Sequence, residues 1–117
     1  MRSERENLLL AAKAAGLEVW PGTGFQAHQL FRRPDTADPS GKVSGVEWNP
    51  RGDDGDNRRL QVRLRLGLVP LDGGGWDCVI WDHDEEVTLA TSLDPNQAVV
   101  SAAAEIGAKM QEGQRHG

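Results

Sequence analysis

The fold of this chain is decided by residues 47–64, which read EWNPRGDDGDNRRLQVRL. The segment holds a tryptophan, a proline turn and three aspartates, and it leads into a run in which leucine or valine alternates with other residues. Strict alternation from Leu60 to Leu68 predicts a strand. Aspartates ahead of a run rich in Leu, Arg and Gln predict a helix instead, because aspartate caps the free N–H groups of a helix start. Gly67 would then end the helix, and the residues alone leave both interpretations open.

Length and composition indicate a single folded domain, residues 1–117. The chain is long enough for one core but not for two, and 38% of its residues are hydrophobic and fall in periodic segments. The single cysteine, Cys78, excludes an internal disulfide and a cysteine-based zinc site, and it favours a reduced, cytoplasmic setting. Neither a signal peptide nor a run of 18 apolar residues is visible, so we expect no membrane span.

The net charge of −5 argues against direct nucleic-acid binding, because Lys and Arg supply most of the affinity for phosphate groups. A local basic site stays compatible with this charge, and so does an acidic protein that imitates nucleic acid. We therefore expect the partner to be a host protein or a small, nucleotide-like ligand.

Both ends of the chain have helical patterns. Ser3 and Glu6 have the form of a capping box, and Gly16 is a natural end for the first helix. At the other end Asp94 is the expected N-cap, with Pro95 in the favoured first position. Apolar residues recur at helical spacing in the first helix at Leu8, Leu9, Ala11, Ala12 and Ala15, and in the last at Val99, Ala103, Ile106 and Met110.

Between these helices the sequence predicts a small, mostly antiparallel sheet. Strands are expected over residues 17–20, 24–33 and 43–48, and in a hairpin of residues 76–82 and 85–91 with its turn at residues 82–84. The inward side chains of the hairpin are expected to be Val79, Trp81, Val87 and Leu89. Residues 34–42 are expected to form a flexible loop and residues 112–117 a frayed tail.

The central motif resembles a family of small phage and prophage proteins. Its pattern is Trp48-Asn49-Pro50, followed by Asp53-Asp54-Gly55-Asp56 and then Arg59-Leu60. This pattern is similar to the one shared by proteins with the phage alpha-beta-alpha sandwich domain, and residues 9–16 and 98–110 are also similar to the ends of that domain. Residues 21–45 and the extra arginines after Asn57 depart from it.

The resemblance implies a phage origin and a helix over residues 56–66. The predicted fold class is therefore α+β, a single-domain α/β sandwich in which N-terminal, central and C-terminal helices cover the sheet. The family has no established activity, so the resemblance implies no catalytic residues.

The aspartates of the motif are one candidate site. Asp53, Asp54 and Asp56 lie on a short glycine-containing segment, and carboxylate oxygens there suit calcium or magnesium. The glutamate that would complete an EF-hand loop is missing. A simpler explanation is that Asp56 caps a helix while Asp53 or Asp54 organises a turn, so we expect no metal and no cofactor, although cation binding by this loop stays open.

The tryptophans are a second candidate. Four tryptophans are many for a chain with no tyrosine and two phenylalanines. With neighbouring arginines they could stack on a nucleobase or anchor a partner protein, although packing in the core is the simpler explanation. Trp48 is the leading candidate among the tryptophans, because it lies close in the sequence to Arg51 and to the aspartates of the motif. The candidate ligand or partner-binding residues are Trp48, Arg51, Asp53, Asp54, Asp56, Arg58 and Arg59.

No catalytic motif is present. The charged residues 82–86 fit a hairpin turn, and no base is placed next to Cys78 to activate it.

We expect a non-enzymatic phage accessory protein in the host cytoplasm that binds, and so modulates or inhibits, a host protein of defence or nucleic-acid processing. The alternatives are a protein that sequesters a small molecule or nucleotide, and a virion or assembly component. A homo-oligomer stays open.

Overall fold

The structure is a computed structural model that describes residues 2–34 and 45–116, with side chains described up to residue 113. Its helices are α1 (Glu4–Ala14), α2 (Asp54–Leu64) and α3 (Pro95–His116), with a short 3-10 helix, η1 (Gly24–Gln26). Its strands are β1 (Val19–Pro21), β2 (Leu30–Arg32), β3 (Val46–Trp48), β4 (Gly67–Pro70), β5 (Trp76–Asp82) and β6 (Glu85–Ser92). The expected flexible loop of residues 34–42 lies, apart from Pro34, outside the described residues.

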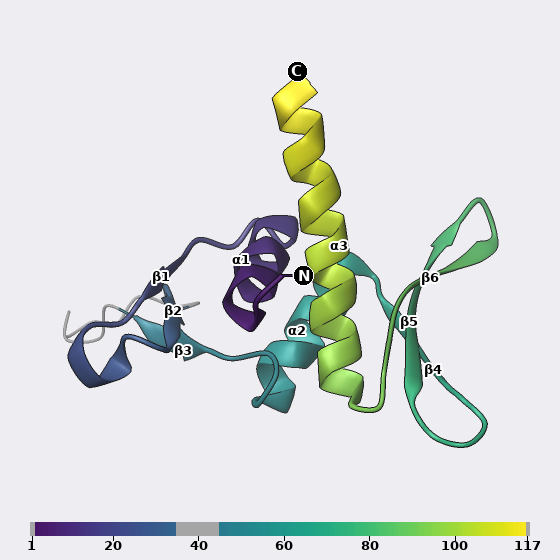
Figure 1. The fold of residues 1–117 in the computed structure, drawn as a ribbon, viewed down its shortest axis with the longest axis horizontal. Helices are drawn as coiled ribbons and strands as arrows, with labels where there is room; N and C mark the ends of the chain where they lie inside the picture. Colours follow the sequence, from purple (N-terminus) through teal and green to yellow (C-terminus); the bar gives the residue numbers. More distant parts are fainter. Residues whose placement is uncertain (1, 35–44, 117) are drawn as a thin grey trace.

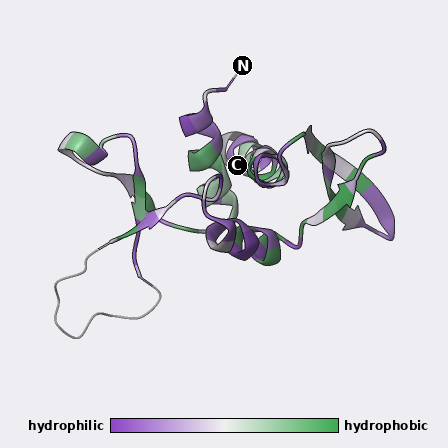
Figure 2. Ribbon diagram, turned by 90° about the horizontal axis from the view of Figure 1, so that it is seen from below, coloured by the Kyte–Doolittle hydropathy of each residue, from purple (hydrophilic) through white to green (hydrophobic). Residues whose placement is uncertain are grey.

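The three helices gather in the centre of the molecule, with a three-stranded antiparallel sheet on each side of them (Figures 1 and 2). One sheet has the order β1-β2-β3 and the other the order β4-β5-β6. The predicted α+β class is confirmed, but the strands form two sheets where we expected one. The reason is that α2, which lies between β3 and β4 in the chain, carries the backbone from one side of the helical centre to the other.

α1 begins and ends as predicted. The Ser3 hydroxyl accepts a hydrogen bond from the Glu6 N–H (3.1 Å), and the Glu6 carboxylate accepts one from the Ser3 N–H, which completes the capping box. At the other end Gly16 has a φ of +69°, and the Leu17 N–H donates to the Ala12 carbonyl (2.9 Å). These are the marks of a Schellman motif, which turns the chain sharply out of the helix.

α2 confirms the helical interpretation of the central segment, and the strand interpretation is wrong. Asp53 is the N-cap, and its carboxylate accepts hydrogen bonds from the backbone of the first turn. The helix ends at Arg65, which adopts the left-handed conformation (φ +56°), and the Leu66 N–H donates to the Gln61 carbonyl (2.9 Å). Gly67 therefore does not end the helix and belongs to β4.

β5 and β6 form the predicted hairpin. Its turn lies at His83 and Asp84, which both have positive φ, as a tight two-residue hairpin turn requires. A register shift lies between Cys78 and Val79, and both side chains are fully buried. The residue left unpaired by this shift is Leu89 of β6, so the extra residue of the bulge lies in β6.

Two of the four hairpin side chains that were expected to point inward do so. Val79 is buried and Leu89 half-buried, as predicted. The prediction is wrong for Trp81 and Val87, which are 57% and 38% exposed. Both lie between the bulge and the turn, where the hairpin extends away from α3 (Figure 1). Trp81 packs over Gly67 of β4 instead, where an added side chain would overlap its ring.

α3 is the longest helix and begins as predicted. The Asp94 carboxylate accepts a hydrogen bond from the Asn96 N–H (2.9 Å), and Pro95 is the first helical residue. Six residues of the helix have no exposed surface: Ala98, Val99, Val100, Ala102, Ala103 and Ala104. The tail that we predicted to fray from residue 112 continues the helical backbone to His116.

α1 and α3 pack against each other through small side chains. Ala11 and Ala12 of α1 are buried against the alanines of α3. At the closest point, a methyl carbon added to Gly107 would overlap the backbone carbonyl of Leu10. The two helix backbones are therefore in direct contact at Gly107, and any larger residue there must push them apart.

We predict that Gly107→Ala lowers the free energy of unfolding by about 1–2 kcal/mol, because the added methyl group overpacks the contact between α1 and α3. The overpacking itself costs about 2–3 kcal/mol at a contact this close, and alanine recovers roughly 1 kcal/mol over glycine inside a helix. Chemical denaturation followed by tryptophan fluorescence measures the change. Gly113→Ala is the matched control, because the same helix has open space around Gly113. A Gly107→Ala protein as stable as the control would contradict the close contact.

Candidate binding site

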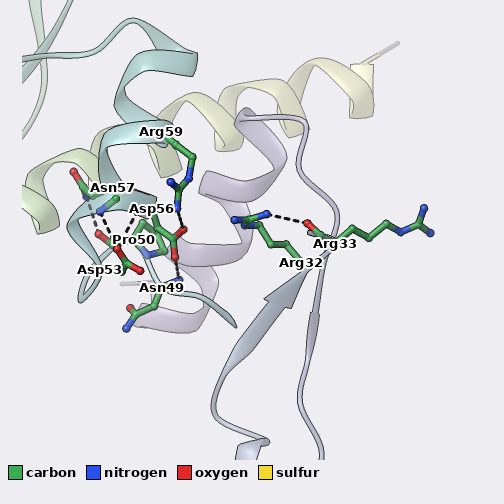
Figure 3. Close-up of polar contacts among 9 residues, drawn as sticks. Arg32, Arg33, Asn49, Pro50, Asp53, Asp56, Asn57 and Arg59 are labelled. Atoms are coloured by element: carbon green, nitrogen blue, oxygen red, sulfur yellow. Dashed lines mark hydrogen bonds and ion pairs between the residues drawn. The ribbon is translucent and has the colours of Figure 1, made fainter. Parts of the chain in front are cut away.

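Asp56 is a buried carboxylate in the first turn of α2, with 3% of its surface exposed. One oxygen, Oδ2, accepts a hydrogen bond from the Asn49 N–H (2.9 Å), and the other, Oδ1, forms a salt bridge with Arg59 (2.6 Å; Figure 3). A buried charge persists when it is paired and hydrogen-bonded in this way. Asp56 was predicted to cap the helix. The cap is Asp53, and Asp56 instead fastens the turn that precedes α2.

Asn57 is as deeply buried as Asp56 and joins the same turn to the start of α3. Its Nδ2 donates to the Pro50 carbonyl (2.8 Å) and to the Asn96 carbonyl at the start of α3 (3.1 Å). Asn96 in turn donates from its side chain to the Arg51 carbonyl (3.1 Å) and to Asp54 (3.0 Å). The turn after β3 and the starts of α2 and α3 are therefore fastened together at one place.

The three aspartates of the motif point to different partners. Asp53 accepts from the N–H groups of Gly55 (2.8 Å) and Asp56 (3.4 Å), and Asp54 accepts from Asn96. Within the described parts of the chain, no group of three or more His, Cys, Asp or Glu residues is arranged to hold a metal ion. The observed hydrogen bonds give each carboxylate a structural role in the motif.

Two other candidate residues are also engaged in the structure. Trp48 is 4% exposed and packs in the core, opposite Leu30 in the pairing of β2 with β3. Arg51 forms a salt bridge with Glu4 of α1. Neither side chain is an open binding surface by itself.

A groove runs between the end of α1 and the side of α2. It consists of an open cavity of 790 Å³ and a more enclosed cavity of 460 Å³, which share Arg59, Arg63 and the chain at Ala15 and Gly16. We call the two cavities together the basic groove. Four of the candidate residues line it: Trp48, Asp56, Arg58 and Arg59. Arg51, Asp53 and Asp54 do not, and neither do Trp20, Trp76 and Trp81.

Three parts of the fold build the enclosed cavity. α2 contributes residues three and four positions apart, which a helix places on one face: Asp56, Arg59, Leu60 and Arg63. The sheet of β1 to β3 contributes Trp48 of β3 and also Arg32 of β2, which lies on the same face of its strand as Leu30, the residue paired with Trp48. The end of α1 contributes Leu17, where the Schellman motif redirects the chain.

Positive charge is concentrated in the basic groove. Its described lining residues include six cations and a single carboxylate, Asp56, in a chain whose net charge is −5. The cations are Lys13, Arg32, Arg58, Arg59, Arg63 and Arg65. A cleft lined by one sign of charge focuses the electrostatic potential, so the groove attracts anions although the protein as a whole is acidic.

Contacts with the protein position the guanidinium groups of the enclosed cavity. Arg59 is paired with Asp56, and the Arg63 Nε donates to the Ala15 carbonyl at the end of α1 (2.5 Å). Arg32 donates to the Arg33 carbonyl (2.9 Å) and extends toward the Asp56–Arg59 pair, while Arg33 points the other way (Figure 3). A guanidinium carries five N–H donors in a fixed fork, so a group held in this way can also donate to a ligand.

Most polar side chains in the described lining of the basic groove are guanidinium groups. The described residues that line it include no Ser, Thr, Cys or His. Cys78 lies in the core, and burial raises the pKa of its thiol to about 11, so the thiol is protonated and unreactive at neutral pH. Arginine forks match the oxygen geometry of carboxylates and phosphates. The arrangement is suited to holding an anion.

Four of the six cations were not predicted from the sequence. Arg63 could have been found, because a helix over residues 56–66 places it on the same face as Arg59. Arg65 follows at the end of that helix. Lys13 and Arg32 come from α1 and β2, and only the tertiary fold brings them to the groove.

No family model matches the chain, and neither a curated protein nor a solved structure matches it significantly. The resemblance to the phage alpha-beta-alpha sandwich domain therefore stays a prediction. Across the described helices, none is both long enough and apolar enough to cross a membrane.

We predict that Asp56→Ala lowers the free energy of unfolding by about 2–4 kcal/mol. The substitution leaves the Asn49 N–H buried without its acceptor and removes the counter-ion of Arg59. Urea denaturation followed by tryptophan fluorescence measures the loss. Asp54→Ala, which removes an exposed acceptor from the same turn of α2, is the control and should cost about 1 kcal/mol or less. Equal losses in the two variants would show that Asp56 has no special structural role.

Proposed function

We propose that this protein is a small phage accessory protein that acts by binding, and that the basic groove is its binding site. The observation that carries the proposal is the concentration of six cations around one groove in an acidic chain. The phage setting rests on the resemblance of the central motif. Since the described lining of the groove includes no Ser, Thr, Cys or His and is dominated by guanidinium groups, binding explains the groove better than catalysis does.

The chemistry of the groove selects an anionic ligand. An inhibitor that imitates nucleic acid would have to present carboxylates, whereas the carboxylates of the central motif are engaged with the backbone, with Arg59 and with Asn96. The groups that face the groove are guanidinium groups. An anion that approaches this face is attracted, and the rest of the acidic surface repels it, so binding is directed to the groove.

Sequestration of a small anion fits the shape of the groove better than docking onto a host protein. Part of the groove is an enclosed cavity of 460 Å³, which lies within the size range of small-molecule sites. A protein interface would instead require a surface of roughly 800 Å² on each partner. In an infected cell, withdrawal of such a ligand would modulate the host defence or nucleic-acid-processing system that depends on it.

We predict that the full-length protein, purified gently at low salt from cells that express it, carries a bound small anion that native mass spectrometry detects. Arg58→Glu should lower the occupancy at least about tenfold, because it reverses a charge in the groove. Arg33→Glu reverses an exposed charge outside the groove and should leave the occupancy unchanged. A bare polypeptide mass in the unmodified protein would contradict the proposal, and so would a bound anion that both variants retain equally.

A further inference from the structure

We infer that the ligand of the enclosed cavity is a phosphate monoester with an apolar body of nucleoside size. This inference rests on the proposed function and names the ligand class for the same site. It follows from three properties of the cavity: the charge of its described lining, the apolar residues that line it beside that charge, and the contacts that hold its arginines in place.

The charge of the lining matches a phosphate monoester. Among the described residues, three guanidinium groups and one carboxylate line the enclosed cavity, and together these side chains carry two net positive charges. A phosphate monoester carries about −1.5 to −2 charges at neutral pH, whereas a carboxylate carries one. It also presents three oxygens to the guanidinium forks, and Arg32, Arg59 and Arg63 approach the cavity from two different elements.

The rest of the cavity suits an apolar group. Leu17, Trp48 and Leu60 line it beside the arginines. Trp48 is 4% exposed, so its ring forms part of a packed wall and does not offer an open face for stacking. A ligand that is only an ion would leave this apolar wall wet, whereas a ligand with an apolar body removes it from water and gains affinity.

The site is also preorganised. Asp56 holds Arg59, and the Ala15 carbonyl holds Arg63, before any ligand binds. Both contacts belong to the fold itself, since Asp56 fastens the turn before α2 and Ala15 ends α1. Binding therefore requires little ordering of these long side chains, which lowers the entropic cost of association.

The inference is tested by titrating the full-length protein, freed of any bound ligand, with three probes: adenosine monophosphate, adenosine and inorganic phosphate. Isothermal titration calorimetry measures binding, and a change in the tryptophan fluorescence, to which Trp48 at the cavity wall contributes, reports it independently. We expect the monophosphate to bind at least about tenfold more tightly than either fragment, because only it engages the guanidinium groups and the apolar wall together. No binding of the monophosphate at millimolar concentration overturns the inference, and so does inorganic phosphate that binds equally well.

A pair of charge-matched variants locates the site. Arg63→Gln keeps a donor for the Ala15 carbonyl but removes one positive charge from the cavity, and it should weaken monophosphate binding about tenfold or more. Arg33→Gln removes an exposed charge outside the cavity and should leave the affinity unchanged. Equal affinities of the two variants would place the ligand elsewhere and overturn the inference.

The two proposals fail in different ways. If the monophosphate does not bind but native mass spectrometry still finds an anion that depends on Arg58, the ligand class is wrong and the binding function of the groove stands. If neither probe nor native ligand binds, both are wrong.

Discussion

The rest of the structure depends on two adjacent polar side chains, Asp56 and Asn57, buried in the first turn of α2. Neighbouring residues on a helix point in directions about 100° apart. Asp56 therefore reaches the turn after β3, while Asn57 reaches both that turn and the start of α3. Each unsatisfied polar group at such a site costs about 1–3 kcal/mol, so the three segments are fixed in one arrangement. The Trp-Asn-Pro and Asp-Asp-Gly-Asp pattern has a structural explanation in these bonds.

The same arrangement builds the basic groove. One carboxylate oxygen of Asp56 faces the turn, and the other faces Arg59. A contact required by the fold therefore also positions a cation of the groove. Arg63 has a similar double role, because its Nε donates to the Ala15 carbonyl at the C-terminal end of α1 and its side chain lines both cavities. A cation is favourable at the C-terminal end of a helix. α1 is itself placed by its contact with α3 at Gly107. The groove is thus rigid because structural contacts hold its walls.

Local features of the fold were predictable from the sequence, and features that depend on distant contacts were not. The capping box at Ser3, the Gly16 turn and the Asp94 cap each depend on a few consecutive residues, and all are present. The alternation from Leu60 to Leu68 was misleading, since Val62 is 66% exposed on a helix rather than buried in a strand. The aspartates and the helix-forming residues of the segment favoured a helix about equally, and the resemblance to the phage family decided for the helix that the structure has.

The division of the strands between two sheets depends on pairing between distant segments, and short strands give little sequence signal for it. The binding groove was predicted only in part for the same reason. Arg58 and Arg59 belong to the central motif, but Lys13 and Arg32 reach the groove through the packing of α1 and β2. The burial of Trp48 also could not be read from its neighbours, because it follows from the pairing with Leu30.

Hydrogen exchange at the Asn49 backbone amide tests the central claim most directly. Asn49 lies in a turn, outside any helix or strand, where amides ordinarily exchange through local opening. Because its N–H donates to the buried carboxylate of Asp56, we predict that it exchanges only through global unfolding, with the same free energy as the core of α3. An Asn49 amide that exchanges as quickly as the exposed amides of η1 would contradict the account, since the motif would then not hold the structure together.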